Sequence, residues 1–95
     1  MATLPDITVT SDDFISLNTE SGLAAGTLMN VQLKTTSWIR LIQSSTKPDP
    51  SSEDGLILTN LSYNYAVATV LAGGDEVWAI CTQKGKTSKV VVQEL

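Results

Sequence analysis

Residues 31–43, VQLKTTSWIRLIQ, constrain the fold more than any other stretch, because they hold two extended segments separated by a short polar break. In the first segment Met29, Val31 and Leu33 alternate with polar residues, which is the period-two pattern of a half-buried strand. The break at residues 35–37 is short enough for the second segment to return as the next antiparallel strand. This stretch therefore predicts the middle of a β-sheet.

The second segment differs from the first because both of its faces carry apolar side chains. Ile39 and Leu41 share one face, while Trp38, Arg40 and Ile42 share the other. A solvated sheet face rarely carries two large apolar groups, so we expect this surface to have a partner. Trp and Arg are enriched at interface hot spots, which makes Trp38, Arg40 and Ile42 candidate protein-interface residues. The alternative is that Trp38 and Ile42 face a second sheet.

Other short segments along the chain follow the same pattern. We expect strands at residues 14–17, 27–34, 38–43, 56–58, 65–71, 76–82 and 88–95. Residues 76–82 are apolar on both faces, so this strand should be central, and residues 83–87 should form a hairpin loop. A helix at residues 23–29 would be barely one turn long because of its glycines, so we expect a loop that leads into the strand at residues 27–34.

Short strands separated by turn signals are typical of a sandwich or barrel. We therefore predict an all-β fold, a small antiparallel β-sandwich that is jelly-roll-like, with about seven or eight short strands and little or no helix.

Residues 1–13 are predicted to form an extended N-terminal arm, and residues 14–95 the β-sandwich domain. Pro5 breaks any helix, and Ile7 and Val9 alternate with polar residues as in a short edge strand. The arm is polar and terminal, so alone it would not offset the ordering cost of about 1–2 kcal/mol per residue. We expect Ile7 and Val9 to be interface residues that add to a sheet edge of a neighbouring protomer. The competing interpretation is that they complete the protomer's own sheet.

Size and charge exclude several classes of function. The chain has 95 residues, which is enough for one domain, and its net charge is −4. Six Lys and Arg residues spread along an acidic chain do not form a nucleic-acid surface, and they disfavour an anionic membrane. No secretory signal and no apolar run of about 18 residues is present, so we expect a product made in a cytoplasm and released only by lysis.

The residue types needed for catalysis are scarce. The chain has no His, which removes the usual general base and the commonest metal ligand. The carboxylate pairs Asp12-Asp13 and Glu53-Asp54 lie in polar segments, where nothing would raise the pKa of an acid. The single cysteine, Cys81, lies in an apolar strand and is expected to be a buried small hydrophobe rather than a reactive thiol. We predict no enzyme activity, no catalytic residues and no cofactor.

Residues 44–55, SSTKPDPSSEDG, form the clearest loop in the sequence. Asp49, Glu53 and Asp54 lack the spacing of a calcium-binding loop, so we expect a solvated surface loop and no metal site.

A succession of turn and strand cues runs through the chain from about Asp12 onward. The cues are Thr19-Glu20-Ser21-Gly22, Gly26-Thr27, residues 38–43, Thr46-Lys47-Pro48, Asp54-Gly55 with two following leucines, Glu76-Val77-Trp78-Ala79, and a valine-rich terminal strand. This succession resembles small β-rich virion proteins of tailed bacteriophages.

The resemblance implies a capsid decoration (cement) protein that stabilises contacts between major capsid subunits. Its partners would be the major capsid protein and further copies of itself, in a homo-oligomer that is often a trimer. Its location would be the capsid surface of a virion assembled in the host cytoplasm. The arm of about a dozen residues is shorter than the arms by which many such proteins clamp neighbouring capsomers.

Two other classes fit the same residues. A tail, collar or baseplate component of a phage would use the same fold and composition, and copy number in the virion would separate the two. A carbohydrate-binding module would stack sugar rings on exposed Trp38, Trp78, Tyr63 and Tyr65, although only 5% of residues are aromatic and Trp78 is expected to be buried.

Overall fold

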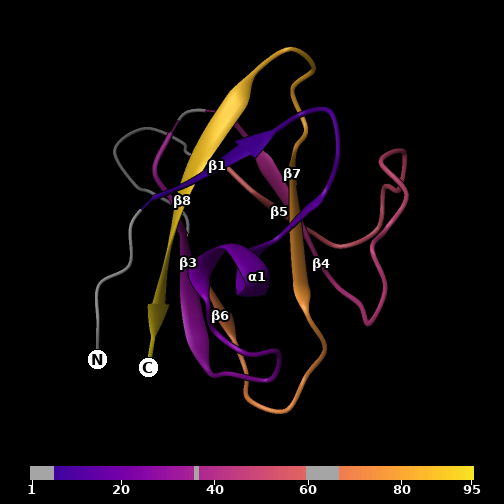
Figure 1. Cartoon of the computed structure of the whole chain (residues 1–95). Coiled ribbons are helices and arrows are strands. Elements are labelled where there is room, and N and C mark those ends of the chain that lie inside the picture. Colours follow the sequence, from indigo (N-terminus) through magenta and orange to yellow (C-terminus); the bar gives the residue numbers. More distant parts are fainter. Residues whose placement is uncertain (1–5, 36, 60–66) are drawn as a thin grey trace.

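Eight strands and one short helix make up the computed structural model of the chain, which describes residues 6–35, 37–59 and 67–95 (Figure 1). Sheet A has the order β1 (Ile7–Thr10), β8 (Thr87–Glu94), β3 (Met29–Leu33) and β6 (Val67–Val70). Sheet B has the order β2 (Ile15–Ser16), β7 (Val77–Cys81), β4 (Ile39–Gln43) and β5 (Leu56–Leu58). All neighbouring strands are antiparallel, so the prediction of a small all-β sandwich is confirmed.

The strand pairs are nested. β4 pairs with β5, β3 with β6, β2 with β7, and β1 with β8. The chain is thus a long antiparallel ribbon that turns at residues 44–55 and is wound so that alternate pairs fall in opposite sheets. This is the winding of a jelly roll, as the strand spacing predicted.

Two predicted neighbour relations are wrong. β3 and β4 were expected to be adjacent, but they lie in different sheets, so the chain changes sheet between Leu33 and Ile39. Residues 83–86 likewise connect sheet B to sheet A instead of closing a hairpin. Both connections are short because the two sheets are stacked at this end of the sandwich. A short link can therefore cross between the sheets as easily as it can close a hairpin within one sheet.

The core fills the space between the sheets, where alternate residues of the strands point inward. Met29, Val31 and Leu33 are fully buried, and Val31 lies opposite Val92 in the β3–β8 ladder. The predicted central strand 76–82 is confirmed as β7, which lies between β2 and β4. Ala68 and Val70 of β6 pack against this core from the edge of sheet A.

The arm prediction is corrected by β1. Ile7 and Val9 pair with β8 of the same chain, opposite Val90 and Ser88, and both side chains are buried in the chain's own core. Burial of each such side chain is worth about 1.5–3 kcal/mol, which offsets the ordering cost that the polar arm alone could not. The sandwich therefore begins at β1, and Phe14 is not its first core residue.

A five-residue helix, α1 (Leu17–Ser21), follows β2 where the sequence predicted the end of a strand and a turn. The Ser16 side chain caps it by accepting from the Thr19 N–H at 3.1 Å, and Gly22 ends it at φ 80°. The buried side chain of Asn18 accepts from the Val77 N–H and donates to the Ala24 carbonyl, which fixes the helix against β7. Residues 23–28 form a loop, so the loop is confirmed but the strand begins at Met29, two residues later than predicted.

No helix in the described ranges is long and apolar enough to cross a membrane. Tyr63 and Tyr65, proposed as sugar-stacking side chains, lie outside the residues that the structure describes.

Candidate interaction surface

The outer face of sheet B is the side that points away from sheet A, and it contains the stretch that the sequence marked as unusual. Ile39 and Leu41 of β4 point into the core, so Arg40 and Ile42 point outward. The strand registers place three further side chains on this face, because Ile57 and Ile80 lie opposite Arg40, and Trp78 lies opposite Ile42. Most of these outward side chains are apolar.

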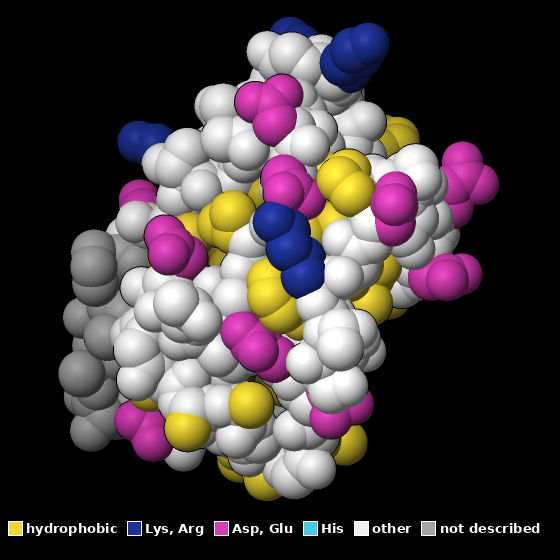
Figure 2. Space-filling model, turned by 45° about the vertical axis from the view of Figure 1, so that its right-hand side comes forward, with side chains coloured by type: hydrophobic (Ala, Val, Ile, Leu, Met, Phe, Trp, Pro, Cys, Tyr) yellow, Lys and Arg dark blue, Asp and Glu magenta, His cyan; other side chains and the backbone are white. Residues whose placement is uncertain are grey.

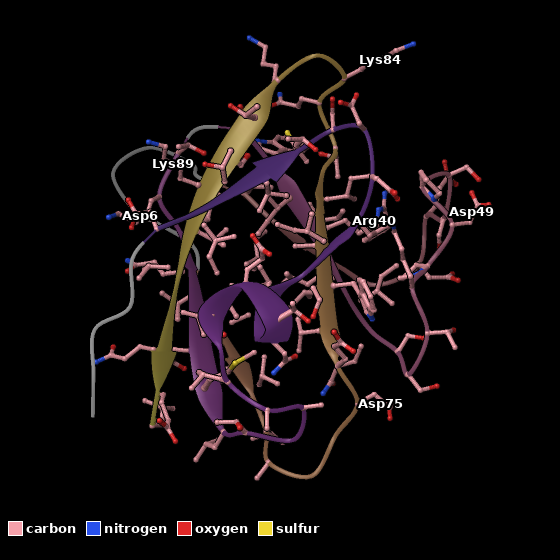
Figure 3. The ribbon with its side chains drawn as sticks, viewed as in Figure 1. Asp6, Arg40, Asp49, Asp75, Lys84 and Lys89 are labelled. Carbon is pink, nitrogen blue, oxygen red and sulfur yellow. The ribbon has the colours of Figure 1, made fainter. Side chains whose placement is uncertain are left out.

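Residues 44–55, here called the cover loop, fold back against this outer face. The Arg40 guanidinium donates to the main-chain carbonyls of Glu53 and Asp54, the latter at 3.2 Å. The Trp78 indole N–H donates to the Ser44 carbonyl at 3.0 Å. Figure 3 shows Arg40 between the strands of sheet B and the loop that carries Asp49. Part of the partner expected for this face is therefore the chain itself.

The return of the cover loop to β5 depends on Gly55. Its φ is +100°, a region that L side chains rarely adopt. A Cβ at this position would overlap the main-chain carbonyl oxygen of Leu41 and lie 2.6 Å from Cγ1 of Ile42, so the backbone passes β4 too closely for any side chain. The glycine thus fixes where the loop rejoins sheet B.

Two carboxylates help to hold the cover loop. Lys47 forms an ion pair with Asp13, and the hydrogen bond from Lys47 lowers the pKa of the Asp13 carboxyl below its usual 3.8. Asp49 accepts from the hydroxyl and N–H of Ser51 at 2.6 and 2.9 Å, and these bonds lower the pKa of Asp49. Asp49 therefore organises the loop through a local turn.

Phe14 and Ile80 are buried, yet neither belongs to the core between the sheets. Phe14 precedes β2, and the β2–β7 register places it beside Ile80 on the outer face. Both side chains are thus shielded on the outside of sheet B, which forms a second, smaller apolar cluster there.

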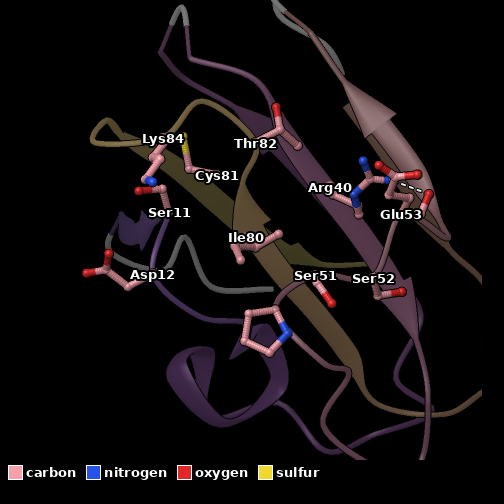
Figure 4. Close-up of a pocket in the computed structure, with 11 residues that line it drawn as sticks. Ser11, Asp12, Arg40, Ser51, Ser52, Glu53, Ile80, Cys81, Thr82 and Lys84 are labelled. Atoms are coloured by element: carbon pink, nitrogen blue, oxygen red, sulfur yellow. Dashed lines mark hydrogen bonds between the residues drawn. The ribbon is translucent and has the colours of Figure 1, made fainter.

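A cleft of about 420 Å³ lies between the cover loop and sheet B (Figure 4). Ile80 forms part of its floor, Arg40 and Glu53 lie on one side, and Ser11, Asp12 and Lys84 lie on the other. The hydroxyls of the loop serines and Thr82 add further polar groups. The lining therefore mixes donors and acceptors over an apolar floor, with two acids and two bases.

Trp38 is the large apolar side chain that the cover loop leaves open, with 42% of its surface exposed. Its backbone is nonetheless fixed, because its carbonyl accepts from the Thr82 N–H at 3.0 Å and its N–H donates to the Gln83 side chain at 3.3 Å. Ile57, diagonally placed on β5, is also exposed. On the side that carries residues 44–55, Figure 2 shows hydrophobic side chains around a central basic one.

The structure places the predicted interface residues in different environments. Trp38, Arg40 and Ile42 share one outward face, as predicted, and the alternative that Trp38 and Ile42 face the second sheet is excluded by the inward Ile39 and Leu41. Trp38 remains open, Ile42 is half-buried, and Arg40 is engaged by the cover loop. Ile7 and Val9 lie in the core and are not part of this surface. Trp78 was expected to be buried and is half-buried.

Ile57 and the cover loop were missed as parts of this surface. The pattern Leu56-Ile57-Leu58 is too short to reveal which residue points outward without knowing the register to β4. The loop has no apolar side chain other than its prolines, so its sequence gave no sign that it would lie over an apolar face.

Reactive groups do not converge within the described ranges, where no three residues among Cys, Asp and Glu are placed to hold a metal ion. Cys81 is buried, as predicted, and the Ser88 hydroxyl lies 3.6 Å from its sulfur. The Glu76 carboxylate accepts from the hydroxyls of Ser16 and Thr19, which ties β7 to the start of α1.

The fold and this surface define a small jelly-roll sandwich with an open aromatic anchor. No family model, curated protein or solved structure matches the chain.

Proposed function

We propose that this chain is a non-enzymatic structural protein of a phage virion, which binds the outside of the capsid as a decoration protein and stabilises contacts between major capsid subunits. The phage assignment rests on the resemblance of its turn and strand cues to small β-rich virion proteins. The all-β sandwich is the fold that this resemblance implies.

The single observation that carries the binding role is the state of Trp38. The ring is exposed, while both main-chain groups of the residue are hydrogen-bonded to the start of the β7–β8 connection. An aromatic side chain on a fixed backbone loses little conformational entropy on binding, which is the property of an interface anchor. Ile57 widens the apolar surface beside it.

The mechanism needs no chemistry. A protein that binds across a subunit boundary adds its own interface free energy to the contacts that must break before the shell opens. The cover loop occupies part of the rest of the outer face of sheet B, where it contacts Arg40, so the most exposed apolar surface offered to a shell is defined by Trp38 and Ile57.

The test mixes the purified chain with shells assembled from the major capsid protein of the same virus, and counts bound copies after sedimentation. Trp38→Ala should weaken shell binding by at least tenfold, since truncation of a buried aromatic anchor costs about 2 kcal/mol or more. Leu95→Ala is the matched control, because Leu95 is similarly exposed (47%) but lies at the end of sheet A.

Three outcomes would contradict the proposal. Trp38→Ala could bind shells as well as the natural chain, it could fail to fold, or the natural chain could be present in roughly a dozen copies per virion. The last result would identify a tail, collar or baseplate component.

A second candidate function is saccharide binding, which the polar cleft between the cover loop and sheet B favours. Arg40, Glu53 and the loop hydroxyls supply paired donors and acceptors over the apolar floor of Ile80, and the cleft volume is within the ~300–1,000 Å³ of ligand pockets. Binding on a glycan array that is lost in Trp38→Ala and in Glu53→Gln would favour this function over shell binding.

A further inference from the structure

The four edge strands of the sandwich are not equally protected. An edge strand exposes unpaired main-chain groups, and proteins usually guard it with charge, proline, shortness or a covering element. β1 has Asp6 before it and Asp12 soon after it, β2 has two residues and runs into α1, and β5 has three residues beside the acidic cover loop. β6 and Leu71 after it, VATVL, carry no charge and no proline.

The direction of the free main-chain groups follows from the neighbouring ladder. The Lys34 N–H donates to the Lys89 carbonyl, and the Leu95 N–H donates to the Leu28 carbonyl. Even-numbered residues of β3 therefore face β8, and odd-numbered ones face β6. Met29 and Val31 pair with Val70 and Ala68, so the main-chain groups of Ala68 and Val70 face β3. The N–H and C=O groups of Val67, Thr69 and Leu71 then point to the open edge.

This edge is complementary to itself. If a second copy approaches with its β6 antiparallel and Thr69 lies on the two-fold axis, Leu71 falls opposite the partner's Val67, and Ala68 opposite the partner's Val70. Side chains on the outer face of one sheet then lie beside side chains on the outer face of the other. The same holds for the inner faces, as a continuous sheet requires. The same register pairs the free N–H and C=O groups of Val67, Thr69 and Leu71 with their counterparts.

The side chains at this edge support the same register. Leu71 and Val67 are the most exposed large hydrophobic residues of sheet A, at 72% and 51%, and the register places each against the other. Leu28, which precedes β3, lies beside Leu71 when the β3–β6 register is continued by one residue, and it is also partly exposed, which extends the apolar area.

Charge favours β6 over β1 as the edge strand through which two copies pair. The chain carries a net charge of −4, so two copies repel each other over most approaches. Pairing through β1 would bring Asp6 and Asp12 of the two copies together, whereas residues 67–71 carry no charge. In the described part of the chain, no strand lies on the far side of β6.

We propose that two copies of this chain associate through β6, joining their sheets A into one continuous antiparallel sheet about a two-fold axis at Thr69. This contact is on the opposite sheet from Trp38, so Trp38 remains accessible to another partner in the dimer. It goes beyond the proposed function, and its test needs no capsid shell.

The first test measures the mass of the full chain by sedimentation equilibrium. The natural chain should be a dimer at micromolar concentration. Val67→Lys with Leu71→Lys places lysines opposite each other and should raise the dimer dissociation constant by about a hundredfold or more, because opposed like charges cost several kcal/mol.

The matched control is Val67→Glu with Leu71→Lys. It changes the same two positions, but across the two-fold axis each Lys then faces a Glu, so the dimer should return at concentrations where the double-lysine variant is a monomer. Both variants should unfold at similar temperatures, since these positions are exposed.

The second test reports the register. Thr69→Cys should form an intermolecular disulfide under mild oxidation, because residues on the axis lie within the ~4.4–6.8 Å between Cα atoms that a disulfide requires. Thr8→Cys, on the other edge strand of sheet A, should not, and Cys81 is buried in the natural chain.

The proposal is overturned if the natural chain is still a monomer at about a hundred micromolar, well above the concentration at which the dimer is expected. It is also overturned if the double-lysine variant stays as dimeric as the natural chain, or if Thr69→Cys cross-links no faster than Thr8→Cys.

Discussion

The outer faces of the two sheets differ although the strands behind them bury similar residues. Sheet A presents mainly polar side chains away from β6, such as Thr8, Asn30, Gln32 and Lys89. Sheet B presents Phe14, Ile80 and their neighbours, and the cover loop lies against them. A sheet whose outward residues are apolar needs a covering layer, and a loop poor in apolar side chains can supply it.

The outer face of sheet B should behave energetically as core. Phe14→Ala should lower the free energy of unfolding by about 3–5 kcal/mol, as for a buried Phe, although Phe14 lies outside the core between the sheets. Val91→Ala, on the outer face of sheet A, should cost about 1 kcal/mol. Urea denaturation measures both, and equal losses would remove the distinction between the two faces.

A smaller effect is expected where the cover loop rejoins its sheet. Gly55→Ala should lower the free energy of unfolding by about 1–3 kcal/mol, because the backbone is at positive φ and the new Cβ meets Ile42. Gly85→Ala is the control, since Gly85 also has positive φ (77°) but nothing lies within 4 Å of an added Cβ. If thermal unfolding gives the same loss for both, the loop does not require its close approach to β4.

The smallest expected effect is a dependence on acid that is confined to the cover loop. The pKa values of Asp13 and Asp49 are lowered in the fold by hydrogen bonds from Lys47 and from Ser51. Such carboxylates stabilise the fold fully above their unfolded pKa of about 3.8, and this contribution is lost as the pH falls through the lower folded values.

Amide exchange or chemical shifts of loop residues followed from pH 5 to pH 2 measure this effect. The loop around Ser51 should loosen before the ladders of sheet A do. The double variant Asp13→Asn, Asp49→Asn should remove this difference between the regions, and a uniform loosening of both sheets in the natural chain would count against it.

Periodicity identified the strands well but not their neighbours. Alternation placed Val31 and Ile39 inside and Arg40 outside, because burial of one face fixes which side chains point inward. It carries no information on whether a four- or five-residue link stays in one sheet. Among the described strands, β4 and β5 are the only two consecutive ones that share a sheet. The expectation that consecutive strands pair as hairpins was therefore wrong for the β3–β4 and β7–β8 links.

The candidate surface was predicted in part for the same reason. Trp38, Arg40 and Ile42 were placed on one face by local alternation, and that face exists. The engagement of Arg40 depends on carbonyls of residues 53–54, and the burial of Ile7 depends on β8, near the other end of the chain. Neither long-range contact has a local signal, so sequence reasoning assigned both residues to an outside partner.

The nested strand pairs also set an order in which the chain can assemble. Pairing β4 with β5 closes the shortest loop, and each later pair, through β3–β6 and β2–β7 to β1–β8, then needs only a small further closure in place of a long one. Folding would run from the cover loop outward, slowly, because most pairings are distant in sequence. β8 comes last yet lies between β1 and β3, so two of the three strand junctions of sheet A must wait for it.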